Sequence, residues 1–386
     1  MMSLVWGSSS PTPPPPEAAV STMAKKCGGS RGLLSSSKGV VSNSSGAVAS
    51  STTGFPSFLP KEVEKIKDPY ARTLAQRMER LPVQIGSSES FIMSSCVKPQ
   101  KQSEINPVVL LHCFDSSCLE WRCAYPLLEE AGLEAWAVDV LGKAPTMQCS
   151  IQASSSLSVL EVYIRRPMIL VGPSLGASVA IDFAVHYPVA VEKLVLINAS
   201  VYAEGTGDLA KLPKFLAYAG VGVQKCLNFT SVIISSNLMI SKGRCSIIVM
   251  LKYRYVHMMR DHAIASLYAF MQICWPSMDI SLSTTFDWTN VGRLHCLLPW
   301  WKDATVSFMS SGGYNVISQI KQVKQKALVI CSEQDHIISY KQILRLRCEL
   351  PYAIMRLIPD SGHLPHVENP SPVAKLIAGF AQNDRC

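Results

Sequence analysis

The sequence lacks an apolar run long enough to cross a membrane as a helix. Its longest stretches without charged residues, such as Ala263 to Met278, fall short of the roughly 18 to 20 apolar residues that a spanning helix needs. Pro276 also interrupts that stretch. We therefore expect no membrane span, while a peripheral contact with a membrane stays open.

Paired cysteine motifs are absent as well. The 13 cysteines are odd in number, irregularly spaced and without a C-x-x-C pair, which fits neither a small disulfide scaffold nor a zinc site. We expect reduced thiols, no metal and no cofactor. Charged residues make up only 17% of the 386 residues and apolar residues 48%, which excludes a disordered chain, a collagen or a coiled coil.

Acidic residues are scarce at the N-terminus. Residues 1–60 contain four basic residues, one acid, 15 serines and a proline run at 11–16. A serine-rich, acid-poor and arginine-poor leader predicts a disordered transit peptide for the chloroplast (plastid), with a plain disordered tail as the alternative. The formal net charge of +8 includes no basic run outside this leader, so we expect no nucleic-acid partner.

Beyond this leader, buried-looking strands alternate with amphipathic helices. Apolar runs predict strands, and the segments between them predict helices. The strands are expected at 107–112, 134–141, 167–172, 192–198, 326–332 and 353–359, and the helices at 118–131, 175–186, 340–349 and 372–381. A further charged helix is expected at 61–81, followed by a hairpin around Gly86. Strands that are apolar on both faces and separated by helices predict a mostly parallel central sheet flanked by helices, an α/β fold.

The alternation stops between Ala199 and Gln319. We therefore expect an inserted, mainly helical cap at 200–319, which divides a core into residues 61–199 and 320–386.

The segment VGPSLGA places Ser174 between an expected strand and an expected helix. It matches G-x-S-x-G, a sharp strand-to-helix turn in which Gly172 and Gly176 avoid side-chain clashes and the serine is lifted clear of the sheet. The pattern predicts that Ser174 is a nucleophile. A glycine-rich turn with an incidental serine is the alternative.

A serine nucleophile needs a base and a carboxylate, and they follow it in the chain order acid, then histidine. Asp335 and His363 each follow an apolar strand, where loops at carboxyl strand ends build sites in open sheets. We predict that they complete a catalytic triad. Glu333 is the alternative acid and His366 the alternative base, while His336 is expected at the surface.

Together LLHCFDSS, VGPSLGA, the Asp335 loop and SGHLPH resemble the α/β-hydrolase superfamily, in particular plant plastid serine hydrolases with a helical cap. The resemblance implies cleavage of a carboxylic ester through an acyl-enzyme. Aromatic residues in the cap, such as Trp288, Trp300 and Trp301, favour a small lipophilic ester substrate, although packing explains such residues too. A receptor-like ligand-binding protein and a catalytically inactive homologue are the alternatives.

The same resemblance implies an oxyanion hole formed by the backbone N–H groups of Leu175 and Phe114. Cys113 stands where many relatives have glycine, so its Cβ is expected to disturb the aim of Phe114, and Cys113→Gly is expected to raise kcat at least about tenfold. The short segment 143–160 and the segment 231–285 also depart from the family pattern.

Overall fold

The computed structural model describes residues 54–84, 91–140, 163–202, 282–299, 301–310 and 315–383. Several sequence-based expectations concern residues outside these ranges. They are the leader up to residue 53, the turn at Gly86, the segment 143–160, Trp300, and the part of the expected cap at 203–281, which includes most of the atypical segment 231–285. No helix among the described residues is long and apolar enough to cross a membrane.

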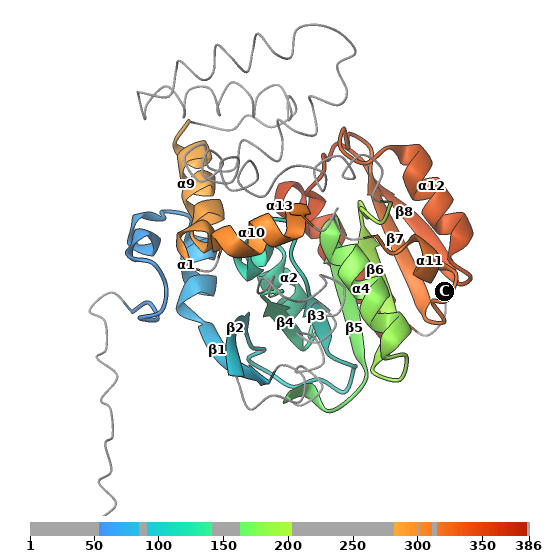
Figure 1. Cartoon of the computed structure of the whole chain (residues 1–386), viewed down its shortest axis with the longest axis horizontal. Coiled ribbons are helices and arrows are strands. Elements are labelled where there is room, and N and C mark those ends of the chain that lie inside the picture. The colour runs from blue at the N-terminus through green and yellow to red at the C-terminus, as the bar shows by residue number, and fades with distance from the viewer. Residues whose placement is uncertain are drawn as a thin grey trace, which may run out of the picture. The chain divides into compact units, whose positions relative to one another are not determined.

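The centre of the fold is an eight-stranded sheet with the order β1-β2-β4-β3-β5-β6-β7-β8 (Figure 1). β1 and β2 pair antiparallel, as do β2 and β4, and every other neighbouring pair is parallel. The strands are β1 (Met78–Gln84), β2 (Phe91–Val97), β3 (Val108–Leu110), β4 (Ala135–Val138), β5 (Met168–Pro173), β6 (Val191–Ile197), β7 (Lys326–Ser332) and β8 (Ala353–Ile358). The expected mostly parallel α/β sheet is confirmed.

Helices cover both faces of the sheet (Figure 1). The described α-helices are α1 (Pro69–Gln76), α2 (Tyr125–Glu130), α4 (Leu175–His186), α9 (Leu282–Arg293), α10 (Trp301–Ser310), α11 (Ile317–Ile320), α12 (Tyr340–Glu349), α13 (Pro365–Glu368) and α14 (Pro370–Gln382). The 3-10 turns are η1 (Lys61–Lys65), η2 (Cys118–Cys123) and η5 (His295–Leu297).

The core divides into two layers because successive side chains of a strand point to opposite faces. On β5, Leu170 packs in the layer with α4, α11 and α12, whereas Ile169 and Val171 pack in the layer with α1, η2, α2 and α14. All of these strand side chains are fully buried. Both faces of the parallel strands are therefore covered, as their continuous apolar sequence predicts.

Local sequence signals explain where several helices begin. Asp68 caps α1 because its carboxylate accepts the N–H groups of Tyr70 and Ala71 at 2.9 and 3.0 Å. Ser339 and Gln342 form a capping box at the start of α12. The helix expected over 118–131 is divided into η2 and α2, with Pro126 in the first turn of α2, where a missing N–H costs nothing.

The N-terminal prediction was wrong in one respect. The residues expected as one helix at 61–81 form the turn η1, the short helix α1 and then the beginning of β1 at Met78. Pro69 accounts for the break, since the residue before a proline avoids the helical region and Asp68 there is non-helical.

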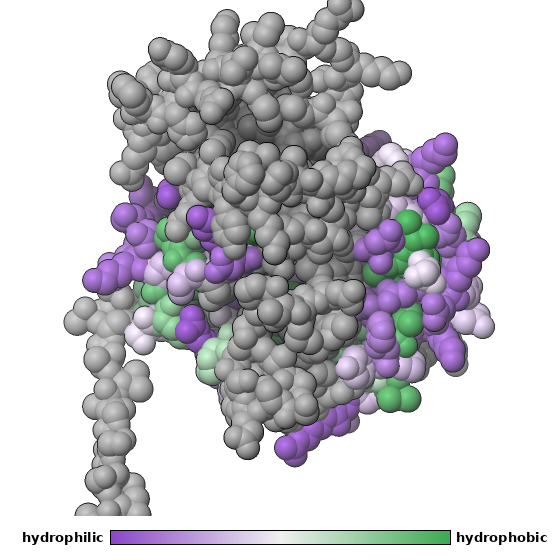
Figure 2. Space-filling model, viewed as in Figure 1, coloured by the Kyte–Doolittle hydropathy of each residue, from purple (hydrophilic) through white to green (hydrophobic). Residues whose placement is uncertain are grey.

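The visible surface of the described residues is mainly hydrophilic, with small hydrophobic areas between the polar ones (Figure 2). Exposed apolar side chains such as Tyr70, Val189 and Tyr352 are scattered along the chain. Such isolated residues are ordinary for a surface in contact with water.

Candidate active site

Ser174 occupies a strained turn between β5 and α4. Its φ is 48° and its ψ is −114°, a conformation that costs free energy in a residue with a Cβ. The N–H of Ser174 donates to the carbonyl of Ile197 on β6 at 2.8 Å, and its carbonyl accepts from Ser200 N–H at 3.1 Å. Hydrogen bonds to the neighbouring strand therefore hold the turn in place.

Glycine is required on both sides of this turn. A Cβ on Gly172 would lie 2.3 Å from the carbonyl carbon and oxygen of Gly176, and a Cβ on Gly176 would lie 2.9 Å from the carbonyl oxygen of His112. Both clashes involve backbone atoms, which cannot move away as a side chain could. The G-x-S-x-G spacing thus follows from the close approach of β5, α4 and the loop after β3.

Asp335 and His363 lie together, as the sequence predicts. Asp335 Oδ2 accepts a hydrogen bond from His363 Nδ1 at 2.9 Å, and the side chains are only 4% and 11% exposed. Asp335 Oδ1 accepts the backbone N–H groups of Ile337 and Ile338 at 2.8 and 3.0 Å. The carboxylate is therefore fixed, and Nε2 is the ring nitrogen of His363 left for proton exchange.

The electrostatic balance at His363 favours its protonated form. Burial alone would lower the pKa of His363, but the nearby carboxylate and hydrogen bond of Asp335 outweigh it, and the pKa is raised above its ordinary value of 6.5. This environment stabilises the imidazolium that forms when His363 accepts a proton.

Two side chains that the sequence analysis did not single out hold the loop around His363. The amide of Asn198 donates to the carbonyls of Gly362 and His363 at 3.2 and 2.9 Å. The carboxylate of Glu368 accepts the N–H groups of Gly362 and Leu364 at 2.6 and 2.9 Å. The backbone on each side of the imidazole is thereby fixed.

Asn198 also connects neighbouring strand ends. It is 1% exposed with a φ of 42°, and its Oδ1 accepts the N–H of Ser332 at 2.9 Å. It lies directly after β6, and the sequence shows it as a polar residue that closes an apolar run. No sequence signal separates Glu368 from an ordinary helix residue.

The alternative acid and base have other partners. Glu333 is exposed, and its carboxylate accepts the N–H of Asp360. His366 is fully buried and bonded through Nε2 to Glu120 at 2.7 Å, and its ring lies 4.5 Å from the ring of Trp121 at an angle of 37°. His336 is exposed. Among the alternatives considered, the geometry therefore favours Asp335 and His363.

The loop after β3 carries the candidate oxyanion donor Phe114. His112 Nδ1 donates to the carbonyl of Cys113 at 2.7 Å, and its Nε2 accepts the N–H of Val140 at 3.0 Å, so this ring links the loop after β3 to the residues after β4. The N–H of Cys113 donates to the carboxylate of Glu120 at 3.2 Å. Cys113 does not adopt a positive φ, so its Cβ imposes no left-handed strain on the loop.

The second candidate donor is Leu175. As the first residue of α4, it has no carbonyl four residues earlier in the helix to accept its N–H. A helix N-terminus also carries a partial positive charge, which favours a developing anion.

A cavity of about 200 Å³ lies beside Asp335 on the side of α12. Asn198, Glu333 and Ile338 are among its lining residues, but Ser174 and His363 are not. This cavity is therefore not the place where an ester would meet Ser174.

Among the described residues, one group has ligand types and spacing that could hold a metal ion. One ligand atom each from Asp115, His295 and Cys296 lies within 4.8 Å of the others. However, Asp115 Oδ1 already accepts hydrogen bonds from His295 Nε2 and from Trp301 Nε1 at 2.9 and 2.6 Å. The group fits a hydrogen-bonded cluster better than a metal site.

This combination of fold and strand-end residues defines an α/β hydrolase. A family model described as "Alpha/beta hydrolase family" matches residues 108–376, well over half of the chain, and the chain belongs to this family. It is 50% identical over 338 residues to the alpha/beta hydrolase domain-containing protein VTE7 of Arabidopsis thaliana, across 85% of this chain and 91% of that protein.

Solved structures agree on the fold. A thermophilic esterase from Thermogutta terrifontis superposes with a TM-score of 0.51 at 14% identity, across 78% of this chain and 97% of that one. Carboxylesterase CesB of Bacillus subtilis superposes with a TM-score of 0.51 at 16% identity, across 84% of this chain and 99% of that one. At these identities the likeness concerns the fold.

Proposed function

We propose that this protein is a serine hydrolase that cleaves carboxylic esters through an acyl-enzyme. The observation that carries the proposal is the buried 2.9 Å hydrogen bond between His363 and Asp335, in a fold that holds Ser174 at a strained strand-to-helix turn. Ester bonds are the favoured class because two of the structures with this fold are esterases.

The proposed reaction uses the residues in fixed order. His363 Nε2 takes the proton of Ser174 Oγ as that oxygen attacks the ester carbonyl, and Asp335 stabilises the resulting imidazolium. The N–H groups of Phe114 and Leu175 bind the negative oxygen of the tetrahedral intermediate. The imidazolium then gives its proton to the leaving alcohol, which leaves the acyl group on Ser174. Water, activated by the same histidine, releases the acid and restores the serine.

We extend the proposal to lipophilic esters because the neighbours of the nucleophile in the chain are apolar. Pro173 and Leu175 flank Ser174, and Phe114 lies in the facing loop. The tryptophans of the expected cap give weaker support than the sequence suggested. Trp301 is 3% exposed with its N–H bonded to Asp115, and Trp288 lies against the guanidinium of Arg122, so both have structural partners.

Hydrolysis of 4-nitrophenyl esters with acyl chains of two to twelve carbons tests both parts of this proposal. We expect turnover by the full chain, a kcat/KM that rises with chain length, and no turnover by Ser174→Ala. Ser178→Ala is a matched control, since Ser178 lies on α4 with its hydroxyl bonded to the Ser200 carbonyl. Absence of turnover on every ester would contradict hydrolysis, and a preference for the acetate ester would contradict the lipophilic class.

We also propose a plastid location, which the serine-rich, acid-poor residues 1–60 support. The chain is also similar to a protein of the plant Arabidopsis thaliana, and plastids are plant organelles. Protein recovered from isolated plastids is expected to begin between about residues 40 and 65, where the composition changes. An intact Met1 in that protein would contradict the proposal.

A further inference from the structure

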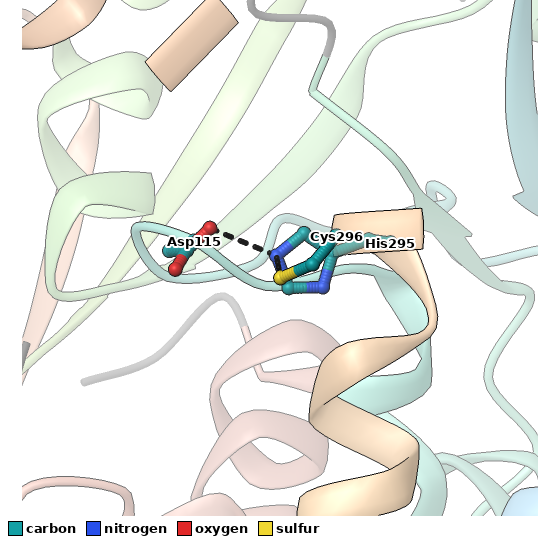
Figure 3. A group of neighbouring side chains, drawn as sticks. All are labelled: Asp115, His295 and Cys296. Carbon is teal, nitrogen blue, oxygen red and sulfur yellow. Dashed lines mark hydrogen bonds and ion pairs between the residues drawn. The ribbon is translucent and has the colours of Figure 1, made fainter. Parts of the chain in front are cut away.

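Asp115 accepts two hydrogen bonds from a distant part of the chain. His295 Nε2 lies 2.9 Å from Asp115 Oδ1, and Trp301 Nε1 donates to the same oxygen at 2.6 Å. Figure 3 shows the carboxylate of Asp115 directed at the imidazole of His295, with the sulfur of Cys296 beside the ring. The side chains of Asp115 and His295 are only 5% and 6% exposed.

Asp115 directly follows Phe114, the candidate oxyanion donor. Its φ of 54° lies in the left-handed region, which aspartate adopts more readily than most residues with a Cβ, and the contacts of its side chain with His295 and Trp301 add to what holds this backbone. On the other side of Phe114, the N–H of Cys113 is held by the carboxylate of Glu120. Phe114 therefore lies between two residues that are held in place. Glu120 in the core binds Cys113, and the segment after α9 binds Asp115.

The segment after α9, which contains His295 and Trp301, is attached to the core through α9. In the middle of α9, the carboxylate of Asp287 accepts the N–H groups of Lys67 and Asp68. Asp68 in turn pairs with Arg122 of η2 at 2.9 Å, and the guanidinium of Arg122 lies over the ring of Trp288. The segment that binds Asp115 is therefore itself held against the core at several points.

The charges of the cluster favour a tight contact. Burial alone would lower the pKa of His295, but its hydrogen bonds to Asp115 and Cys296 raise that pKa to about 10. This shift favours the protonated form of His295, which pairs with the carboxylate of Asp115. Charge-assisted hydrogen bonds of this kind are shorter and stronger than neutral ones.

We propose that Asp115 is a positioning residue for the oxyanion hole: His295 and Trp301 fix the Asp115 backbone so that the N–H of Phe114 points at the developing oxyanion. The inference rests on the proposed hydrolase function. It makes the segment after α9 part of the catalytic arrangement although none of its residues touches the reacting atoms.

The test measures kcat and KM separately on one 4-nitrophenyl ester. Asp115→Ala is expected to lower kcat by about 10- to 100-fold with KM changed less than about twofold, because an oxyanion donor acts mainly in the transition state. Trp301→Phe, which keeps an aromatic side chain but loses the N–H donor, is expected to lower kcat by a smaller factor. Asp115→Asn, which keeps an oxygen acceptor, is expected to recover part of the loss.

Asp182→Asn is the matched control. Asp182 is a buried carboxylate beside His186 on α4, at 3.3 Å, and its Oδ1 accepts from Gln319 rather than from the loop after β3. The kcat of Asp182→Asn is expected to stay within about twofold of the wild-type kcat. A second readout, the ¹³C NMR titration of labelled histidines, is expected to show one imidazole that stays protonated past pH 8 in the wild type but not in Asp115→Asn.

The outcomes separate the two proposals. A wild-type chain without ester turnover would overturn the hydrolase function and the inference with it. Wild-type turnover, with Asp115→Ala and Trp301→Phe both within twofold of it, would overturn only the positioning role. If Asp115→Ala fails to fold, Trp301→Phe decides alone. Activity lost to a chelator and restored by zinc would also overturn the inference, because the cluster would then be a metal site.

Discussion

The carboxylate of Glu120 and the imidazole of His366 form a fully buried contact, with Oε1 and Nε2 2.7 Å apart. It joins η2 to α13, and the same carboxylate accepts the N–H of Cys113 in the oxyanion loop. Burial would raise the pKa of Glu120, but the hydrogen bond and charge of His366 lower it to about 2. The second histidine after β8 therefore supports the loops around the site, whereas His363 is the base that we propose.

Glu120→Gln is expected to lower the free energy of unfolding by about 3 kcal/mol, since loss of the Glu120 carboxylate leaves the buried His366 without its charged partner. Chemical denaturation measures this change. Glu79→Gln is the control, because Glu79 pairs with Lys98 at a site where the two side chains are 54% and 35% exposed. We expect it to cost less than about 1 kcal/mol. Equal losses in the two variants would contradict the account.

The same pair predicts how stability depends on pH. A carboxyl whose pKa falls from 4.5 to about 2 on folding contributes stability above its unfolded pKa, and that contribution is lost as the pH drops from about 4.5 towards 2. The free energy of unfolding of the wild type should therefore fall over this range more steeply than that of Glu120→Gln. Parallel curves from pH 5 to 2 would exclude this role of Glu120.

Asn198→Asp tests the support of the histidine loop. Aspartate keeps the size and tolerates the positive φ, but it loses the donors to the carbonyls of Gly362 and His363 and faces them with a carboxylate. We expect kcat to fall about tenfold and the free energy of unfolding to fall by about 2 kcal/mol. A variant with unchanged kcat and stability would show that Asn198 does not hold His363.

The pH dependence of kcat/KM reports on His363. The base must be neutral to accept the serine proton, so activity is expected to rise with pH through a midpoint above 6.5, because Asp335 raises the pKa of this histidine. Asp335→Asn should lower the rate and move the midpoint to lower pH, since the carboxylate charge is lost. A flat profile between pH 5 and 8 would argue against a histidine base.

Cys113→Gly is expected to leave kcat within about twofold, in contrast to the increase expected from the sequence alone. Cys113 has no positive φ, and Glu120 already holds its N–H, so removal of Cβ relieves no strain. Greater backbone freedom should cost about 0.5 to 1 kcal/mol of stability. A tenfold gain in kcat would mean that the cysteine does distort the oxyanion loop.

The sequence was sufficient for the parts of the fold that repeat a simple pattern. The runs at 326–332 and 175–186 form β7 and α4 with the predicted bounds. A strand buried on both faces is a continuous apolar run, and the glycine turn before α4 has a recognisable sequence, so both could be predicted. The polar strand β1 was not expected to begin at Met78, since MERLPVQ shows no clear alternation.

No sequence pattern predicted the contacts between residues far apart in the chain. Asp115 lies 180 residues before His295, and Glu120 lies 246 residues before His366. Such pairs depend on how the helices pack around the sheet, which propensity and periodicity do not determine. The Asp335–His363 pair could be predicted because both residues follow strands at the same edge of the sheet.

Active-site labelling tests the central claim most directly. The full chain is incubated with a fluorophosphonate probe, which forms a covalent bond with an activated serine, and the modified peptide is identified by mass spectrometry. We predict that wild type carries the label on Ser174, that Ser174→Ala carries none, and that His363→Ala reacts far more slowly, since the triad acts as a unit. Label that persists in Ser174→Ala, or that maps to another serine of the wild type, would contradict the account.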